Sequence, residues 1–281
     1  MNHYAWCTDL HLDHLGDNDA ALIDFAQRLV ANEPQGVMIT GDISNANKLI
    51  YHLSVIERVV QRPVYYTLGN HDYYGSDIET VRKQMKEISN MSQYLKYMPT
   101  MQYLALTPVT ALVGHDGWYD AMLGDAKGSR FMMSDWSMIR DFVQHSGGRR
   151  GLQTGLGFNR GAVIKQAQAL AMEGVLHVQA SIKSAVRYHR SVIVLTHFPP
   201  FAEAHIYQGA VGNAEAMPWY TSKLMGNMLL DAAKVYPNVN FTVLCGHTHG
   251  AATFQAARNL ICRVGAAEYG HPELQSLVEV A

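Results

Sequence analysis

The stretch Cys245-Gly246-His247-Thr248-His249-Gly250, CGHTHG, places two histidines one residue apart between two glycines. The run before it, FTVLC (241–245), is β-branched and aromatic, which is typical of a buried strand. The histidines therefore sit where a strand is predicted to end. In an extended chain, residues i and i+2 face the same side about 6.5 Å apart, a spacing that suits two neighbouring ions better than one. A polar turn with one hydrogen-bonded and one solvated histidine is the alternative, so the rest of the chain must decide.

Four other apolar runs end in residues of the same kind. HYAWC precedes Asp9 and His11, VMIT precedes Asp42, VYYTL precedes Asn70, His71 and Asp72, and SVIVLT precedes His197. Segments 17–32 and 45–61, which separate the first three runs, have apolar residues every three or four positions, as helices do. The intervals of 33 (42 − 9) and 28 (70 − 42) residues fit βαβ units of roughly 30 residues. Parallel strands joined by helices end at one edge of a sheet, so these polar residues are predicted to converge there.

The remaining segments complete an α/β pattern. Residues 80–91 predict a helix, 101–108 and 109–120 an antiparallel pair, and 162–189 a long helix. Segments 251–258, 259–268 and 273–281 predict a terminal meander with turns at Arg258-Asn259 and 270–272. From about Asp116 to Asn159 the pattern fails, apart from one short helix at Ser134–His145. That segment is either a lid over the site or a surface excursion. Without repeats or a linker, 1–281 is expected to be a single domain with a possible lid insertion at about 116–159.

Composition narrows the class of protein. The 281 residues are 48% hydrophobic and 16% charged, which favours a sizeable core over disorder. A formal charge of −2 gives no general attraction for nucleic acid or an anionic membrane. No run approaches the roughly 18 apolar residues that span a bilayer, and no leader pattern precedes HYAWC. The three cysteines lack CxxC spacing and lie in apolar runs, so buried thiols in a cytoplasmic protein are expected.

The residues at the predicted strand ends have the chemistry of transition-metal ligands. Carboxylates together with neutral imidazoles suit divalent first-row metals, whereas calcium or magnesium sites would be nearly all oxygen. Two aspartates against two divalent ions leave a charge of about +2, which would attract phosphate. In two-metal hydrolysis, ions about 3.5–4 Å apart lower the pKa of a shared water and hold the attacking and leaving oxygens. The departing alkoxide then needs a proton, for which a histidine is suited at neutral pH.

Each residue also has a structural alternative. Asp9 and Asp42 would serve as helix N-caps, Asn70 as a turn residue and His197 as a core histidine, if each occurred alone. The joint pattern favours metal binding, because every ligand type stands at its own strand end. Further candidates to approach a substrate are His115, Asp116, Trp118, Tyr119, His205 and Tyr207. Arginines at 130, 140, 149, 150 and 160 are candidates to grip phosphate from the insertion, or are simply solvated.

The order D-x-H, G-D, G-N-H-D, a lone histidine after an apolar strand, and G-H-x-H resembles the calcineurin-like metallophosphoesterase superfamily. The five motifs span Asp9 to His249, which is most of the chain, and none departs from the family pattern. The resemblance implies an α/β fold: a four-layer α/β/β/α sandwich with two mixed β-sheets and a dinuclear metal site at the strand ends.

The resemblance also implies a role for each motif. Asp9, His11 and His249 would hold the first metal ion, and Asp42 would bridge both ions. Asn70, His197 and His247 would complete the second ion's ligands. The two histidines of CGHTHG would then bind different ions. His71 would be a catalytic non-ligand that protonates the leaving oxygen or stabilises the charged transition state, and Asp72 would orient His71 or support the turn.

These inferences predict a metal-dependent hydrolase of phosphate esters, either monoesters or diesters. A metal-bound hydroxide would attack phosphorus while His71 assists the leaving group. The cofactors would be two divalent or mixed-valence transition metal ions: manganese, iron, zinc or nickel. The expected partner is a small phosphate ester, with nucleic acid not favoured and no membrane. A phosphoprotein phosphatase is the enzymatic alternative, and a noncatalytic interaction module on the same fold is the other.

Overall fold

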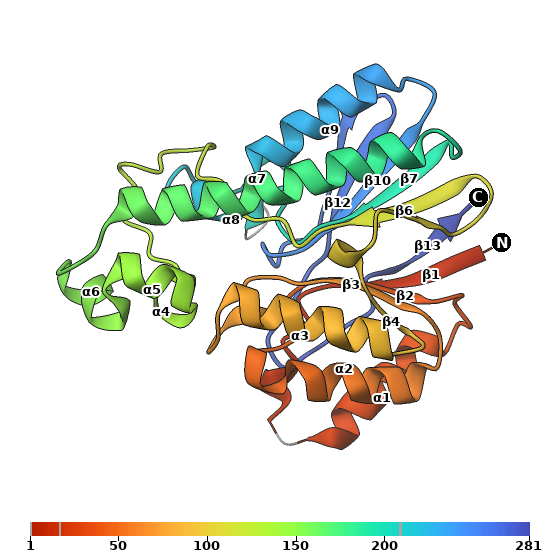
Figure 1. Ribbon diagram of the computed structural model, residues 1–281, viewed down its shortest axis with the longest axis horizontal. Helices are drawn as coiled ribbons and strands as arrows, with labels where there is room; N and C mark the ends of the chain where they lie inside the picture. Colours follow the sequence, from red (N-terminus) through yellow and green to blue (C-terminus); the bar gives the residue numbers. More distant parts are fainter. Residues whose placement is uncertain (1, 17, 208–209) are drawn as a thin grey trace.

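Two mixed β-sheets lie face to face, with helices on both outer surfaces (Figure 1). The computed structural model describes residues 2–16, 18–207 and 210–281. The first sheet has the order β13 (Ser276–Val280), β1 (Asn2–Cys7), β2 (Val37–Thr40), β3 (Val64–Thr67) and β4 (Leu95–Tyr97). Its outer face carries α1 (Asp19–Val30), α2 (Ala46–Val60) and α3 (Ile78–Met91). Strands β1 to β4 are parallel to one another, and β13 runs antiparallel to β1.

The second sheet has a parallel centre and antiparallel edges. Its order is β11 (Ala252–Ala257), β12 (Leu260–Val264), β10 (Asn240–Cys245), β7 (Ser191–Leu195), β6 (Thr110–Gly114) and β5 (Leu104–Ala105). Strands β12, β10, β7 and β6 are parallel, while β11 and β5 run antiparallel to their neighbours. Helices α7 (Arg160–Ala185) and α9 (Lys223–Val235) cover its outer face (Figure 1). This is the predicted four-layer α/β/β/α sandwich.

Apolar side chains fill the three spaces between these layers. Alternate residues of a strand point to opposite faces, so Trp6, Met38 and Leu244 pack between the sheets while Cys7, Ile39 and Val243 face the helices. Strands buried on both faces have near-continuous apolar sequences, which is why VMIT and SVIVLT show no polar alternation. Because both faces of the central strands are covered, the polar side chains lie at the strand ends instead.

The predicted terminal meander is only partly correct. β11 and β12 form the expected hairpin with its turn at Arg258-Asn259. β13, however, leaves that sheet and pairs with β1, with Tyr4 opposite Val278. β12 has β11 on one side and β10 on the other, so it offers no free edge. Crossing to β1 lets Val278 and Val280 join the core between the sheets.

The insertion predicted at about 116–159 contains several short helices rather than one. They are α4 (Asp135–Met138), α5 (Arg140–Ser146) and α6 (Gly148–Thr154), grouped beside the first half of α7 (Figure 1). The extended backbone of Ile139 separates α4 from α5, and Gly147 ends α5 at φ 69°. Trp136 and Phe142 are fully buried, so the group is packed against the protein.

Asp116 joins the two sheets from within rather than approaching a substrate. It follows β6, and its carboxylate accepts a hydrogen bond from the Leu68 N–H beyond β3 at 2.8 Å. The same side chain accepts from the hydroxyls of Tyr73 and Tyr97 at 2.8 and 2.6 Å and pairs with Arg82 at 3.2 Å. Asp116 is fully buried, so these bonds fix the end of β6 against the ends of β3 and β4 in the other sheet.

The structure also tests the predictions for the cysteines, for membrane-spanning helices and for the helix caps. Cys7, Cys245 and Cys262 are buried and free, as expected. Within the described part of the chain, none of the helices combines the length and apolar composition needed to cross a bilayer. Asp9 and Asp42 do not cap the long helices, since the side chains of Asn18 and Asn45 cap α1 and α2.

Replacing Asp116 with alanine should lower the free energy of unfolding by about 3 kcal/mol, because partly buried Arg82 and the buried phenols of Tyr73 and Tyr97 lose their acceptor. Urea denaturation measures the change. Asp24→Ala is the control, since Asp24 and its partner Arg28 are exposed and the variant should unfold like the parent. Equal stability of Asp116→Ala and Asp24→Ala would contradict the linking role.

Candidate metal centre

Sharp loops at the strand ends bring the predicted ligands together. The backbones of Asp9, His11, Asp42, His247 and His249 all have positive φ, between 41° and 72°. Such left-handed conformations are costly for non-glycine residues and persist where the surroundings enforce them, often at functional sites. A methyl group on Gly69 or Gly246 would collide with the carboxylates of Asp42 and Asp9, respectively. Glycine is therefore required for these loops to approach so closely.

The first group of ligands comprises Asp9, His11 and His249. Asp9 accepts hydrogen bonds from the Thr8 hydroxyl at 2.7 Å and from the His247 N–H at 2.9 Å, which fix its carboxylate. His249 Nε2 lies 3.4 Å from Asp9 Oδ1 and 3.0 Å from His11 Nε2. One donor atom from each of the three residues falls within 4.8 Å of the other two. The β1 and β10 ends thus form one compact donor set.

The second group comprises Asp42, His197 and His247, again within 4.8 Å of one another. His197 Nδ1 lies 2.7 Å from the Thr40 carbonyl and His247 Nε2 lies 3.2 Å from the Trp219 carbonyl. A carbonyl can only accept, so these two nitrogens carry the protons. When the two rings are neutral, His197 Nε2 and His247 Nδ1 hold the free lone pairs, the arrangement typical of metal-binding histidines.

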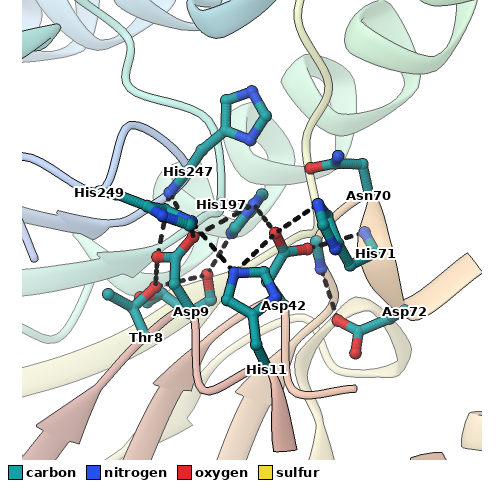
Figure 2. A network of polar contacts seen from close by, with 12 residues as sticks. Thr8, Asp9, His11, Asp42, Asn70, His71, Asp72, His197, His247 and His249 are labelled. Atoms are coloured by element: carbon teal, nitrogen blue, oxygen red, sulfur yellow. Dashed lines mark hydrogen bonds and ion pairs between the residues drawn. The ribbon is translucent and has the colours of Figure 1, made fainter. Parts of the chain in front are cut away.

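Asp42 lies between the two groups. Its Oδ2 is 3.3 Å from His197 Nε2 and 3.8 Å from His11 Nε2, while its Oδ1 accepts the His71 N–H at 2.8 Å. Figure 2 shows the carboxylates of Asp9 and Asp42 among the rings of His11, His197 and His249, with Asn70 and His71 approaching from the other side. One oxygen atom of Asp42 therefore faces ligands of both groups, as a bridging carboxylate must.

The electrostatics of the site hold both carboxylates in their charged form. Burial would raise the pKa of Asp9, but the charges of His197 and His249 outweigh it and lower the pKa to about 2. Burial likewise opposes protonation of His197, yet Asp42 and Asp9 raise its pKa to about 10. For His11, burial prevails and lowers the pKa to about 4. The two carboxylates are thus held in their charged form, ready to neutralise cations.

These residues fit two transition metal ions. Among the described residues, buried Asn70 Oδ1, His197 Nε2 and His11 Nδ1 have no hydrogen-bond partner. Leaving such atoms unpaired is costly, and a cation satisfies the first two directly. Imidazole nitrogens with carboxylate and amide oxygens are the donors that manganese, iron, nickel and zinc accept. The seven residues predicted as ligands lie together around this centre, and their role as ligands stays a prediction: Asp9, His11, Asp42, Asn70, His197, His247 and His249.

Asn70 is oriented by a residue that sequence analysis missed. Its amide nitrogen donates to Asp135 Oδ1 at 2.8 Å and to the Tyr74 hydroxyl at 3.2 Å, and Tyr74 also donates to Asp135 at 2.7 Å. Asp135 is fully buried and comes from α4, at the start of the insertion's helices. Its grip on the amide nitrogen leaves Asn70 Oδ1 as the free acceptor.

His71 and Asp72 occupy different surroundings. The His71 ring stacks on Tyr74 at 4.3 Å between centroids, and its Nε2 lies 3.9 Å from Asp42 Oδ2. Asp72 is fully buried and accepts from the N–H groups of Ile43, Ser44 and Gly69 at 2.8 to 2.9 Å. Of its two predicted roles, these bonds favour support of the turn over orientation of His71.

A cavity of about 440 Å³ opens over the centre. It is lined by Asp42, Asn70, His71, His247 and His249 together with the insertion segment 131–134. His205 also lines it, as predicted, whereas His115, Asp116, Trp118 and Tyr119 do not; the side chain of Tyr207 lies outside the described residues. Tyr269, which no motif identified, covers His11 and His249 at ring distances of 4.4 and 5.1 Å. Its position in a turn after β12 gave no sequence signal.

Asp135→Ala should weaken metal binding about 10- to 100-fold, because Asn70 loses the acceptor that orients its amide. Titration of metal-free protein with manganese, followed calorimetrically, measures the loss. Asp135→Asn keeps a carbonyl acceptor and should restore most of the affinity. Asp125→Ala, an exposed change in the same insertion, is the control. Full affinity in Asp135→Ala would contradict the orienting role.

Comparison with known proteins agrees with this geometry. No curated protein sequence gives a significant match. Phosphopantetheinyl hydrolase (PptH) from Mycobacterium tuberculosis has a similar fold, with a TM-score of 0.64 at 15% identity over 96% of this chain and 90% of that one. A dimetal phosphatase from Danio rerio gives 0.57 at 14% identity, over 96% and 89%. GAP50, the anchor in the inner membrane complex of Plasmodium, gives 0.51 at 11% identity, over 94% and 70%.

At these identities the structural similarities establish the fold alone. The family model is more specific, because it describes sequence as well as fold. The calcineurin-like phosphoesterase model matches residues 3–251, a span that contains both donor groups and His71. The chain therefore belongs to the calcineurin-like phosphoesterase family.

Proposed function

We propose that this protein hydrolyses small phosphate esters, monoesters or diesters, at a dinuclear transition-metal centre. The observation that carries the proposal is the position of Asp42, which faces both donor groups at the floor of a cavity that His71 also lines. Such a floor would hold two cations side by side and present them to a ligand. Membership of a phosphoesterase family supports the same class of reaction.

Two bound ions would supply Lewis acidity, lowering the pKa of a shared water and neutralising charge on the phosphate. The chain's own contribution is to place a proton donor beside the leaving oxygen. His71 is partly exposed to the cavity, and its ring is held by stacking on Tyr74, whose hydroxyl Asp135 fixes. A histidine so placed donates a proton to the departing alkoxide near neutral pH.

The cavity supports a small substrate over a phosphoprotein. Its volume of about 440 Å³ lies within the range of small-molecule sites, and segment 131–134 of the insertion forms one wall. We propose on this basis that the insertion acts as a lid. A net charge of −2 and a free state of all three cysteines support a cytoplasmic enzyme that does not act on nucleic acid.

A noncatalytic interaction module is the second candidate. GAP50, with a similar fold, is an anchor, so the fold is compatible with such a role. The strained loops argue for catalysis here, because an anchor has no need for a left-handed backbone at five ligand positions. Metal-loaded protein assayed on a chromogenic monoester and diester decides: turnover of either supports hydrolysis, and none with manganese, iron, nickel or zinc supports the module.

His71→Asn should leave both metal ions bound and lower turnover by about 10²- to 10⁴-fold, because the leaving oxygen loses its proton donor. Steady-state kinetics combined with elemental analysis measures both quantities on the same preparation. His271→Asn, the same change at an exposed position, should behave like the parent. Unchanged turnover in metal-loaded His71→Asn would remove His71 from the mechanism.

Asp42→Ala should deplete both metal ions, because the carboxylate faces both donor groups. Elemental analysis of protein purified without chelator gives the metal content directly. The exposed Asp24→Ala serves as the control and should retain the parental content. A variant that still holds both ions would show that Asp42 does not bridge them.

A further inference from the structure

The cavity has an apolar and aromatic wall beyond the metal ligands. Phe131, Met132 and Met133 come from the insertion, and Tyr220, the last residue of α8 (Met217–Tyr220), lines the same cavity. The aromatic rings are already packed: Phe131 meets Tyr220 edge-on at 5.6 Å, and Tyr220 stacks on His205 at 5.3 Å with an interplanar angle of 5°. The wall is therefore preformed and continuous with the candidate metal centre.

The same cavity lacks a fixed cation. Among the described residues that line it, none is lysine or arginine, and Asp42 is the carboxylate. The arginine candidates for a phosphate grip, at 130, 140, 149, 150 and 160, do not line the cavity either. Arg130 is almost fully exposed, Arg140 pairs with Asp77, and Arg160 lies over the ring of Trp136 at 5.5 Å. Phosphate would thus be left to the metal ions, and a second anionic group on a substrate would find no lysine or arginine to pair with.

We propose that segment 131–133 and Tyr220 form a binding site for the organic part of the phosphate ester, selecting an uncharged group that carries a flat ring. This inference rests on the proposed function, since it assigns the phosphate to the metal centre. The ring enters beside Phe131 and Met132, where it exchanges water for aromatic and thioether contacts. Burial of apolar area and ring packing supply the selectivity, while an extra charge would be desolvated without compensation.

The site is also positioned by the residues that order the metal centre. Ser134 lines the cavity directly after Met133, and Asp135 next to it bonds Asn70 and Tyr74. Met133, in the apolar wall, is therefore only two residues from Asp135, which hydrogen-bonds the candidate ligand Asn70. The organic group and the phosphate would then contact one continuous segment, so the identity of the organic group sets how well the ester is placed.

Binding of nonhydrolysable phosphonates to manganese-loaded protein tests the proposal without requiring turnover. Calorimetry should give phenylphosphonate about tenfold tighter binding than methylphosphonate. 4-Phosphonobenzoate, which adds a carboxylate to the ring, should lose most of that advantage. Equal binding of phenylphosphonate and methylphosphonate, or tightest binding of the carboxylated ring, would overturn the proposal.

Substitutions in the apolar wall test whether it causes the preference for phenylphosphonate. Phe131→Ala should reduce the preference for phenylphosphonate about threefold or more and leave methylphosphonate binding unchanged. Met132→Ala, at a 44% exposed position that tolerates truncation, should act in the same direction. Arg130→Ala, next in the chain but outside the cavity, should keep the full preference. A preference that survives both wall variants would contradict the assignment.

Activity assays separate this inference from the proposed function. Hydrolysis of phenyl and methyl esters with equal kcat/KM would leave the phosphoesterase standing and remove the ring site. No hydrolysis of any ester, with phenylphosphonate still preferred, would remove the enzyme and retain a site for ring-bearing phosphonates. A higher kcat/KM for the phenyl ester that falls in Phe131→Ala supports both.

Discussion

The crowding of two carboxylates and several imidazoles at the strand ends is the constraint on which the rest of the structure depends. Asp42 Oδ2 lies within 3.9 Å of nitrogens from His11, His71 and His197, and its carboxylate is fully buried. Buried charges at this spacing persist only when cations or hydrogen bonds compensate them. Left-handed loops and glycine at Gly69 and Gly246 make the approach possible, and parallel strands supply the rigid base. The sandwich thus holds together a cluster of buried charges whose approach would be unfavourable without these loops and strands.

Beyond the ligands, a second layer of contacts gives the cluster its orientation. Thr40 and Trp219 carbonyls select the tautomers of His197 and His247, and Asp135 selects the orientation of the Asn70 amide. The insertion therefore does more than cover the cavity. It supplies the Asp135 carboxylate that orients Asn70 and, a few residues earlier, the apolar wall at 131–133. The proposed metal binding and substrate choice would therefore be linked through one short segment.

Sequence motifs predicted which residues gather at one edge because each motif stands at the end of an apolar run that is typical of a strand. The βαβ spacing predicted the parallel strands that carry the first three motifs, whereas the four layers followed from the resemblance to the calcineurin-like superfamily. Sequence patterns failed where tertiary contacts decide. β13 pairs with β1, and no local pattern in SLVEV indicates that partner. Asp135 and Tyr269 are far in sequence from the motifs, and Asp116 was a candidate to approach a substrate although it links two sheets.

Anomalous diffraction from crystals grown with manganese would locate each ion without assuming any ligand. We expect two peaks about 3.5–4 Å apart. One should lie among Asp9, His11 and His249 and the other among Asn70, His197 and His247, with the Asp42 carboxylate between them. A single peak, or two peaks that Asp42 does not join, would contradict a dinuclear centre bridged by Asp42.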